Sequence, residues 1–368
     1  MRIEEESPIY GLPRDSLHQI FSSLPLKQIT ICKSVSKFFY NTLTSRSFVH
    51  LVLNNYNKTP PLKFLALRHS HHHHLHAFDP DSHRWFSFDL AFLPFRSPSP
   101  VASSLGLVYL WADSLQSPSS KSLVVCNPIT RSYRVLPHLG SAWSRHGSVL
   151  VTHPHRVLVL SELATLYLST TLDHWLNFSS NLPSKPRSPI FVRGSLYALC
   201  DVGSPWRSQW KLYFCTLTTK PPLSSQSWSR LEMNKWGDVF DVLKRPRLIP
   251  GTDNNLLMVG ALKSSFALHA PCSAIVILKL DLDTLEWSEA ARMPADMFGC
   301  FQESSKFKVF GGGNRVCFAG KRVGKLALWQ AGEEGIKDDL WQWIEGLPGN
   351  GEGMSRGFIF EASLYDLP

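Results

Sequence analysis

The stretch LPRDSLHQIFSSLPLKQI, residues 12–29, decides how the chain begins. Between its two Leu-Pro pairs, apolar residues recur at the i, i+3, i+4 and i+7 spacing of one helix face. Pro13 suits the first turn of that helix, where its missing N–H is not needed, and Pro25 ends it. The stretch therefore predicts a short amphipathic helix between the two prolines.

Further apolar series continue outward from this helix as far as residue 51. They predict three or four short helices joined by tight corners over residues 12–51. A unit of this size buries little surface by itself. It would be marginally stable unless it docks on a partner or on the rest of the chain.

The chain as a whole has 368 residues, of which 43% are hydrophobic and 18% charged, a globular composition with room for a small module and a large domain. The net charge of +9 is spread without a long basic run, so a mildly basic surface is expected. The alternative, an acidic partner or nucleic acid, would require a basic patch, and nucleic acid is not expected as a partner. The seven cysteines form no Cys-x-x-Cys pair, which disfavours a zinc site or a disulfide framework and favours reduced thiols.

The N-terminal residues MRIEEESPIY have no apolar core and match neither a secretory signal nor a transit peptide. No apolar stretch reaches the roughly 18 residues that a membrane helix requires. We expect a soluble, intracellular protein of the nucleus and/or cytoplasm with no membrane partner.

Residues 54–63 have the composition of a linker, and short apolar segments separated by turns follow to the end of the chain. A unit recurs among them: an apolar strand, a turn, an aromatic residue and a Leu-Pro or Met-Pro stop. The aromatic positions are Trp85, Tyr133, Trp175, Trp228, Trp287 and Trp343. Residues 64–368 accommodate six such units at about 51 residues each, close to the period of about 50 of kelch-type blades.

This period predicts an all-β propeller of six four-stranded blades, with the recurring aromatic residues packed between blades. The last apolar segment, residues 357–364, is expected to pair within the first blade, because ring closure removes exposed strand edges. The fold class is thus a small helical head followed by a propeller.

Residues 12–51 resemble an F-box, and twelve positions follow the family pattern in order. The matching positions are Leu12, Pro13, Leu17, Ile20, Leu24, Pro25, Leu26, Val35, Lys37, Phe39, Ser45 and Phe48. Two positions depart from the pattern: Ser36 replaces the usual Cys and Phe39 the usual Trp, each with a mild change in size.

The F-box resemblance implies docking on a Skp-family adaptor and, through it, on a cullin ubiquitin ligase. A helical unit with more apolar surface than its own core needs is suited to such a role. The residues predicted to bind the adaptor are Leu12, Pro13, Leu17, Ile20, Leu24, Pro25, Leu26, Ile29, Val35 and Phe39.

Along nearly its whole length the chain resembles a plant-type F-box/kelch-repeat protein. This resemblance implies an F-box at residues 9–53, a linker at 54–63 and a kelch-type propeller at 64–368. Only Gly311–Gly313 match the kelch double-glycine position well.

The sequence contains no phosphate loop, no Gly-x-Ser-x-Gly elbow and no His-Glu-x-x-His pair. The sequence therefore predicts no catalytic residue, no cofactor and no metal. The stretch RHSHHHHLH, residues 68–76, is expected to form an exposed loop in the first blade, and whether its histidines bind a metal stays open.

The main functional hypothesis is a non-catalytic substrate-recognition subunit of a Skp–cullin–F-box ubiquitin ligase. Propeller loops would bind a target protein, and the proposed contacts are Trp143, Arg145, Trp206, Trp210 and Trp236, with packing inside the blades as the alternative for each. Two other functions stay open: a scaffold that does not drive degradation, and a propeller that binds a ligand or acts as an enzyme.

Overall fold

The structure is a computed structural model, and it describes the following parts of the chain. These parts are residues 8–55, 62–68, 73–114, 121–152, 156–169, 174–204, 206–217, 227–252, 254–264, 271–302, 307–332, 340–349, 355–363 and 368.

Four α-helices form the N-terminal module, after a single 3-10 turn, η1 (Pro8–Gly11). They are α1 (Arg14–Ser22), α2 (Leu26–Val35), α3 (Lys37–Leu43) and α4 (Arg46–Asn55). Pro13 and Pro25 each stand directly before a helix with extended backbone angles. Ser36 caps α3, because its side chain accepts a hydrogen bond from the N–H of Phe39, and Ser45 does the same for Phe48 in α4.

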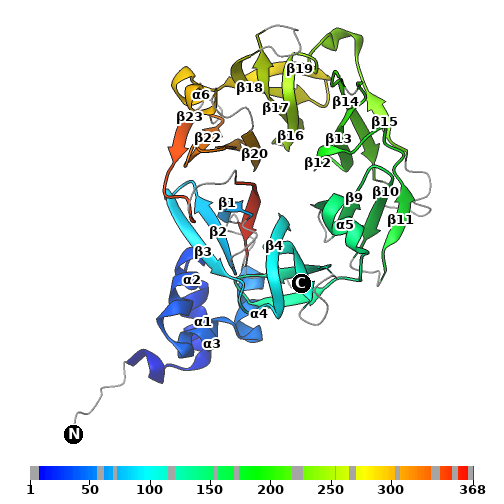
Figure 1. The fold of residues 1–368 in the computed structure, drawn as a ribbon. Helices are drawn as coiled ribbons and strands as arrows, with labels where there is room; N and C mark the ends of the chain where they lie inside the picture. Colours follow the sequence, from blue (N-terminus) through cyan, green and yellow to red (C-terminus); the bar gives the residue numbers. More distant parts are fainter. Residues whose placement is uncertain are drawn as a thin grey trace.

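Six four-stranded antiparallel sheets surround a central axis, so the predicted six-bladed propeller is confirmed (Figure 1). Written from the axis outward, blade 1 is β24 (Gly357–Ala362), β1 (Leu62–Leu67), β2 (His74–Asp79) and β3 (Arg84–Asp89). Blade 2 is β4 (Phe95–Ser104), β5 (Leu107–Ser114), β6 (Lys121–Asn127) and β7 (Ser132–Val135). Blade 3 is β8 (Ser148–Thr152), β9 (Arg156–Leu160), β10 (Ala164–Leu168) and β11 (Leu176–Ser179).

Blade 4 is β12 (Arg187–Val192), β13 (Ser195–Asp201), β14 (Trp210–Thr216) and β15 (Ser229–Leu231). Blade 5 is β16 (Leu243–Pro250), β17 (Asn255–Lys263), β18 (Cys272–Asp281) and β19 (Glu286–Arg292). Blade 6 is β20 (Phe307–Gly312), β21 (Arg315–Gly320), β22 (Leu326–Gln330) and β23 (Leu340–Ile344). Short helices precede three inner strands: α5 (Ser141–His146), η4 (Asn234–Trp236) and α6 (Ala295–Gln302).

The last strand closes the ring. β24 pairs antiparallel with β1 over six residues, from Leu62 opposite Ala362 to Leu67 opposite Gly357. The side-chain amide of Asn127 in blade 2 is fully buried and donates to the carbonyl of Ser363, 2.9 Å away. The C-terminal strand is therefore held by two blades at once.

The recurring aromatic residues all lie on the outermost strand of a blade or directly before it, which explains their period of about 50 residues. Two of them link neighbouring blades through the indole N–H. Trp85 donates to the carbonyl of Glu345 and Trp175 to that of Pro137, both at 2.9 Å.

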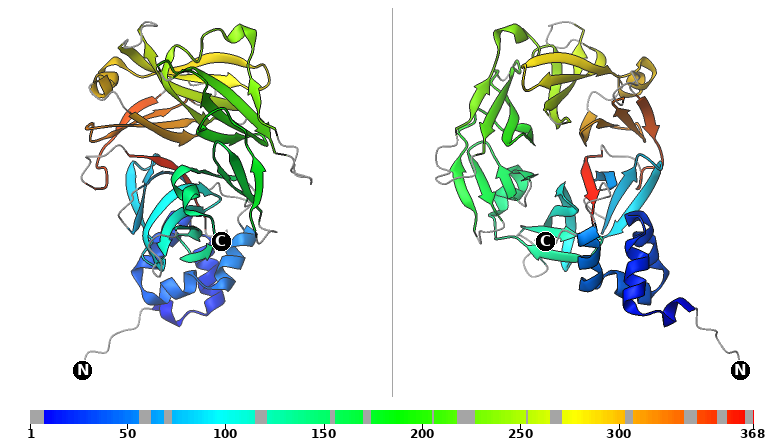
Figure 2. Two further views of the ribbon diagram at one scale, coloured as in Figure 1. Left: turned by 45° about the vertical axis from the view of Figure 1, so that its right-hand side comes forward. Right: turned by 180° about the vertical axis from the view of Figure 1, so that it is seen from behind.

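The helical module shares one continuous core with blades 1 and 2. Leu17, Leu43 and Phe48 belong to the same buried cluster as Val124 and Phe360. Figure 2 shows the helices packed against the rim of the ring at this place. Contact with the propeller buries apolar side chains that a module of this size cannot bury by itself.

Polar contacts reinforce the joint between the module and blade 2. The ammonium of Lys33 donates to the carbonyl of Ile129 at 3.2 Å, and the guanidinium of Arg131 lies 5.5 Å from the ring centre of Tyr40. The orientation of the propeller relative to the helices is thus set by the shared core together with these polar contacts.

Each cysteine lacks a disulfide partner in the structure, and four of the seven side chains are buried. Burial raises the pKa of Cys126 to about 12 and that of Cys200 and Cys215 to about 11. Among the described helices, none has the length and apolar character to cross a membrane. Residues 69–72 of the histidine-rich stretch lie outside the described residues, whereas residues 74–76, expected in an exposed loop, begin β2 with Leu75 fully buried.

Candidate functional site

The helical module carries an unusual share of exposed hydrophobic side chains. Thirteen large hydrophobic residues are exposed within the described parts of the chain, and six of them lie between residues 10 and 38. These six, called the apolar face below, are Tyr10, Leu12, Ile20, Ile31, Val35 and Phe38. Exposed apolar side chains gathered on so small a unit are typical of a protein-binding surface.

Local structure places these side chains outward. Ile31 and Val35 are four residues apart on α2 and therefore project from the same side of that helix. The rings of Tyr10 and Phe38 meet edge to face with their centres 5.1 Å apart. Val35 is the most exposed of the six, with 63% of its surface accessible.

The ten residues predicted to bind the adaptor divide by burial. Leu12, Pro13, Ile20, Pro25 and Val35 are exposed, and Leu24 is half-buried. Leu17, Ile29 and Phe39 are buried in the shared core, so they support the exposed residues from beneath and are not free for direct contact. The side chain of Leu26 lies outside the described residues.

Sequence analysis missed three members of the apolar face: Tyr10, Ile31 and Phe38. The spacing of Ile31 and Val35 was a usable signal, because i and i+4 residues share one face of a helix. Phe38 and Phe39 are adjacent, and only the packing of α3 decides which of the two rings is buried.

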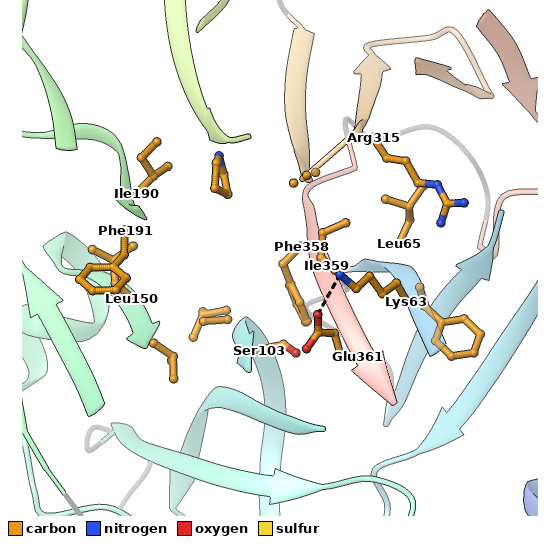
Figure 3. A pocket seen from close by; sticks show the side chains of 18 of the residues that line it. Lys63, Leu65, Ser103, Leu150, Ile190, Phe191, Arg315, Phe358, Ile359 and Glu361 are labelled. Atoms are coloured by element: carbon orange, nitrogen blue, oxygen red, sulfur yellow. Dashed lines mark ion pairs between the residues drawn. The ribbon is translucent and has the colours of Figure 1, made fainter. Parts of the chain in front are cut away.

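The propeller axis contains a cavity of about 600 Å³ (Figure 3). Inner strands of all six blades contribute to its lining, which is largely aliphatic and aromatic, as at Leu150, Ile190 and Phe358. Lys63 and Glu361 form an ion pair at 3.5 Å on the β1–β24 side of the cavity. No group of His, Cys, Asp or Glu that could hold a metal ion occurs among the described residues.

Two of the five proposed target contacts are free to meet a partner. The side chain of Trp206 is 83% exposed in the loop between β13 and β14, and Arg145 is exposed at the end of α5. Trp143 is half-buried against the core shared by blades 2 and 3.

The other two tryptophans are structural, and the alternative of packing inside the blades is the one observed. Trp210 is 7% exposed, and the guanidinium of Arg187 lies 4.3 Å from its ring centre. Trp236 is 8% exposed and its indole donates to the carbonyl of Leu285 at 2.8 Å.

Comparison with known proteins agrees with this two-part architecture. Residues 9–51 match the family model of the F-box domain, and residues 75–319 match the KIB1-4 beta-propeller model. The matched propeller family is thus KIB1-4, and the kelch label rests only on the repeat period and on Gly311–Gly313.

Two relatives match over nearly the whole chain. "SKP1-interacting partner 15" of Arabidopsis thaliana is 56% identical, with 99% of this chain and 100% of the relative covered. "Protein UNUSUAL FLORAL ORGANS" of the same plant is 24% identical, with 96% of this chain and 84% of the relative covered. This chain belongs to the F-box proteins whose second domain is a KIB1-4 β-propeller.

Proposed function

We propose that this protein is the substrate-recognition subunit of a Skp–cullin–F-box ubiquitin ligase, acting in the nucleus and/or cytoplasm. The F-box would dock on a Skp-family adaptor, and the propeller would hold a target protein for ubiquitination. No bond chemistry is assigned to this chain.

The apolar face carries the proposal. Val35 and Ile31 are more than half exposed, on a module whose core is already complete through its contact with the propeller. Burying such side chains against a groove on a partner stabilises the complex by about 25 cal/mol per Å² of apolar surface. The name of the relative that is 56% identical points to the same kind of partner.

The shared core supports the second half of the proposal. A ligase subunit works by proximity, so the target has to be held at a defined place relative to the adaptor. The packing of α1–α4 against blades 1 and 2 provides a fixed joint for this purpose.

Co-purification with a Skp-family adaptor tests the adaptor site. The variants Ile31→Asp and Val35→Asp place a charge on the apolar face without entering the core, and we expect them to weaken adaptor binding roughly tenfold or more. The matched control is Leu163→Asp, a 75% exposed leucine in blade 3, which should bind as the wild type does. Equal binding by all four chains would refute the docking surface.

Ubiquitination of a bound partner separates the ligase from the alternatives. With adaptor, cullin and a captured partner present, the ligase proposal requires modified partner in the wild-type reaction and loss of modification with Val35→Asp. A partner that is bound but never modified would indicate a scaffold. If the chain does not bind the adaptor but binds a small molecule in the axial cavity, the protein is a ligand-binding propeller.

A further inference from the structure

Basic side chains from blades 1, 4, 5 and 6 form a cluster near the axis at one end of the propeller. The inner strands bring most of it together: Arg187 begins β12, Arg245 and Arg247 are the third and fifth residues of β16, and Lys308 is the second residue of β20. The six members, called the basic face below, are Arg68, Arg187, Arg245, Arg247, Lys308 and Arg356.

Chain topology explains why these residues converge. Each blade begins anew at the axis with its inner strand, so the starts of the inner strands meet at one end of the ring. Arg356 directly precedes β24. Arg68 directly follows β1, and β1 runs antiparallel to β24. The backbone N–H of Arg68 donates to the carbonyl of Arg356 at 2.7 Å, which fixes these two residues side by side.

The charges of the basic face are close enough to repel one another. Burial, and then the charges of Arg187, Arg245 and Arg356, lower the pKa of Arg247 to about 10. Burial, followed by the same arginines together with Arg247, also lowers the pKa of Lys308. Such an arrangement costs stability unless an anion is bound there.

Among the residues that the structure describes, counterions are scarce around this cluster. None of the six takes part in an ion pair between described residues. Asp201 raises the pKa of Arg187, but its Oδ1 already accepts the N–H groups of Gly203 and Gln209.

Unused donors remain on two of the arginines. Nε of Arg68 and Nη1 of Arg187 are buried and have no hydrogen-bond partner in the described structure. The guanidinium of Arg187 lies 4.3 Å from the ring centre of Trp210, and Nη2 of Arg68 donates to the carbonyl of Val101. Fixed guanidinium groups with free donors are suited to bidentate binding of oxyanions.

An apolar pocket lies beside these charges. It has a volume of about 200 Å³ and is lined by Cys272, Ile275, Phe298, Phe301 and Phe307, among others. Arg245 belongs both to this pocket and to the basic face, so the two features are continuous. The pocket has room for one large hydrophobic side chain of a ligand.

We propose that the basic face binds an acidic peptide segment of the target protein, with carboxylates on the arginines and a neighbouring apolar side chain in the pocket beside Arg245. This inference names the class of target and rests on the proposed function. A peptide fits better than nucleic acid, because the charges converge near the axis from the inner strands of four blades and do not form a stripe that follows a phosphate backbone.

Fluorescence anisotropy with a labelled glutamate-rich peptide that contains one phenylalanine tests this inference on the full chain. We expect the peptide to bind, its glutamine counterpart not to bind, and the affinity to fall as salt is added. The double variant Arg245→Gln/Arg356→Gln should weaken binding roughly tenfold or more, since two charge-assisted contacts are lost. The control Arg84→Gln/Arg134→Gln removes two exposed arginines from outer strands and should bind normally.

Several results would overturn the inference: no binding of the glutamate peptide, equal binding by the double variant, or preference for an oligonucleotide over the peptide. Thermal unfolding guards against a folding defect, because removing two repelling charges should leave the melting temperature equal or higher. The arginine variants should still co-purify with the adaptor. Loss of peptide binding with adaptor binding intact would thus concern the target site alone, and loss of adaptor binding in Val35→Asp would concern the F-box alone.

Discussion

At the scale of single residues, Lys33 shows how the joint between helices and propeller is made. Its ammonium is buried at the contact with blade 2, and burial, followed by the charge of Arg131, lowers its pKa from 10.5 to about 8. At a pH between these two pKa values, Lys33 binds more protons in the unfolded chain than in the folded chain. The contribution of Lys33 to the free energy of unfolding therefore rises with pH over this range.

We predict that Lys33→Met removes this pH dependence. The variant should be at least as stable as the wild type at about pH 7, because a methionine fills the site without a buried charge. Chemical denaturation at about pH 7 and about pH 9.5 measures the effect, with the wild type gaining stability relative to the variant at the higher pH. Lys37→Met, at an exposed lysine of α3, is the control and should follow the wild type. Parallel pH profiles for Lys33→Met and the wild type would contradict the assignment.

Single residues are also where prediction from sequence was weakest. The local sequence around a tryptophan in a loop-like stretch does not show whether its side chain is exposed, as that of Trp206 is, or buried, as that of Trp236 is. Burial of Trp236 depends on its indole reaching a carbonyl in the β18–β19 turn, 49 residues along the chain. The basic face depends in the same way on residues from four blades, and no local pattern indicates it.

At the scale of elements, the sequence predicts α1–α4 and many of the strands because the determining forces are local. Helix spacing, proline position and the serine caps specify α1–α4, and short apolar segments between turns specify the strands. Ser36, where the F-box pattern has Cys, illustrates this, since its hydroxyl oxygen accepts the N–H of Phe39 at 3.2 Å. Ser36, which departs from the family pattern, thus serves as the N-cap of α3.

We predict that Ser36→Ala lowers the free energy of unfolding by about 1 kcal/mol, the usual effect of losing a serine cap. Urea denaturation followed by circular dichroism measures the change. Ser34→Ala is the matched control, because this exposed serine donates only to the carbonyl of Ile31 within its own helix. If the two substitutions have equal effects, the hydrogen bond to Phe39 does not stabilise α3.

At the scale of the whole molecule, ring closure makes the C-terminal strand indispensable. β24 supplies the inner strand of blade 1, and Phe360 in its middle is fully buried, with its ring centre 5.3 Å from that of Phe88. A chain that ends at Arg356 would leave β1 with an unpaired edge at the axis.

We predict that truncation after Arg356 abolishes cooperative unfolding, because the loss of a buried phenylalanine alone costs about 3–5 kcal/mol. Calorimetry should show a broad transition or none, where the wild type shows a sharp one. Removal of residues 1–7, which precede the first described element, is the control and should leave the transition sharp. A sharp transition in both shortened chains would mean that blade 1 is stable with three strands.

The core that runs from α1–α4 into blades 1 and 2 also limits how these two domains can be recombined. A graft of these helices onto an unrelated propeller would leave Lys33 and Tyr40 facing a surface without the carbonyl of Ile129 or the side chain of Arg131. A chimaera of two such proteins therefore has to take the helices and blades 1 and 2 from the same parent. The natural unit of transfer is then the helices together with these two blades, and target preference can change in the remaining four blades while the joint stays the same.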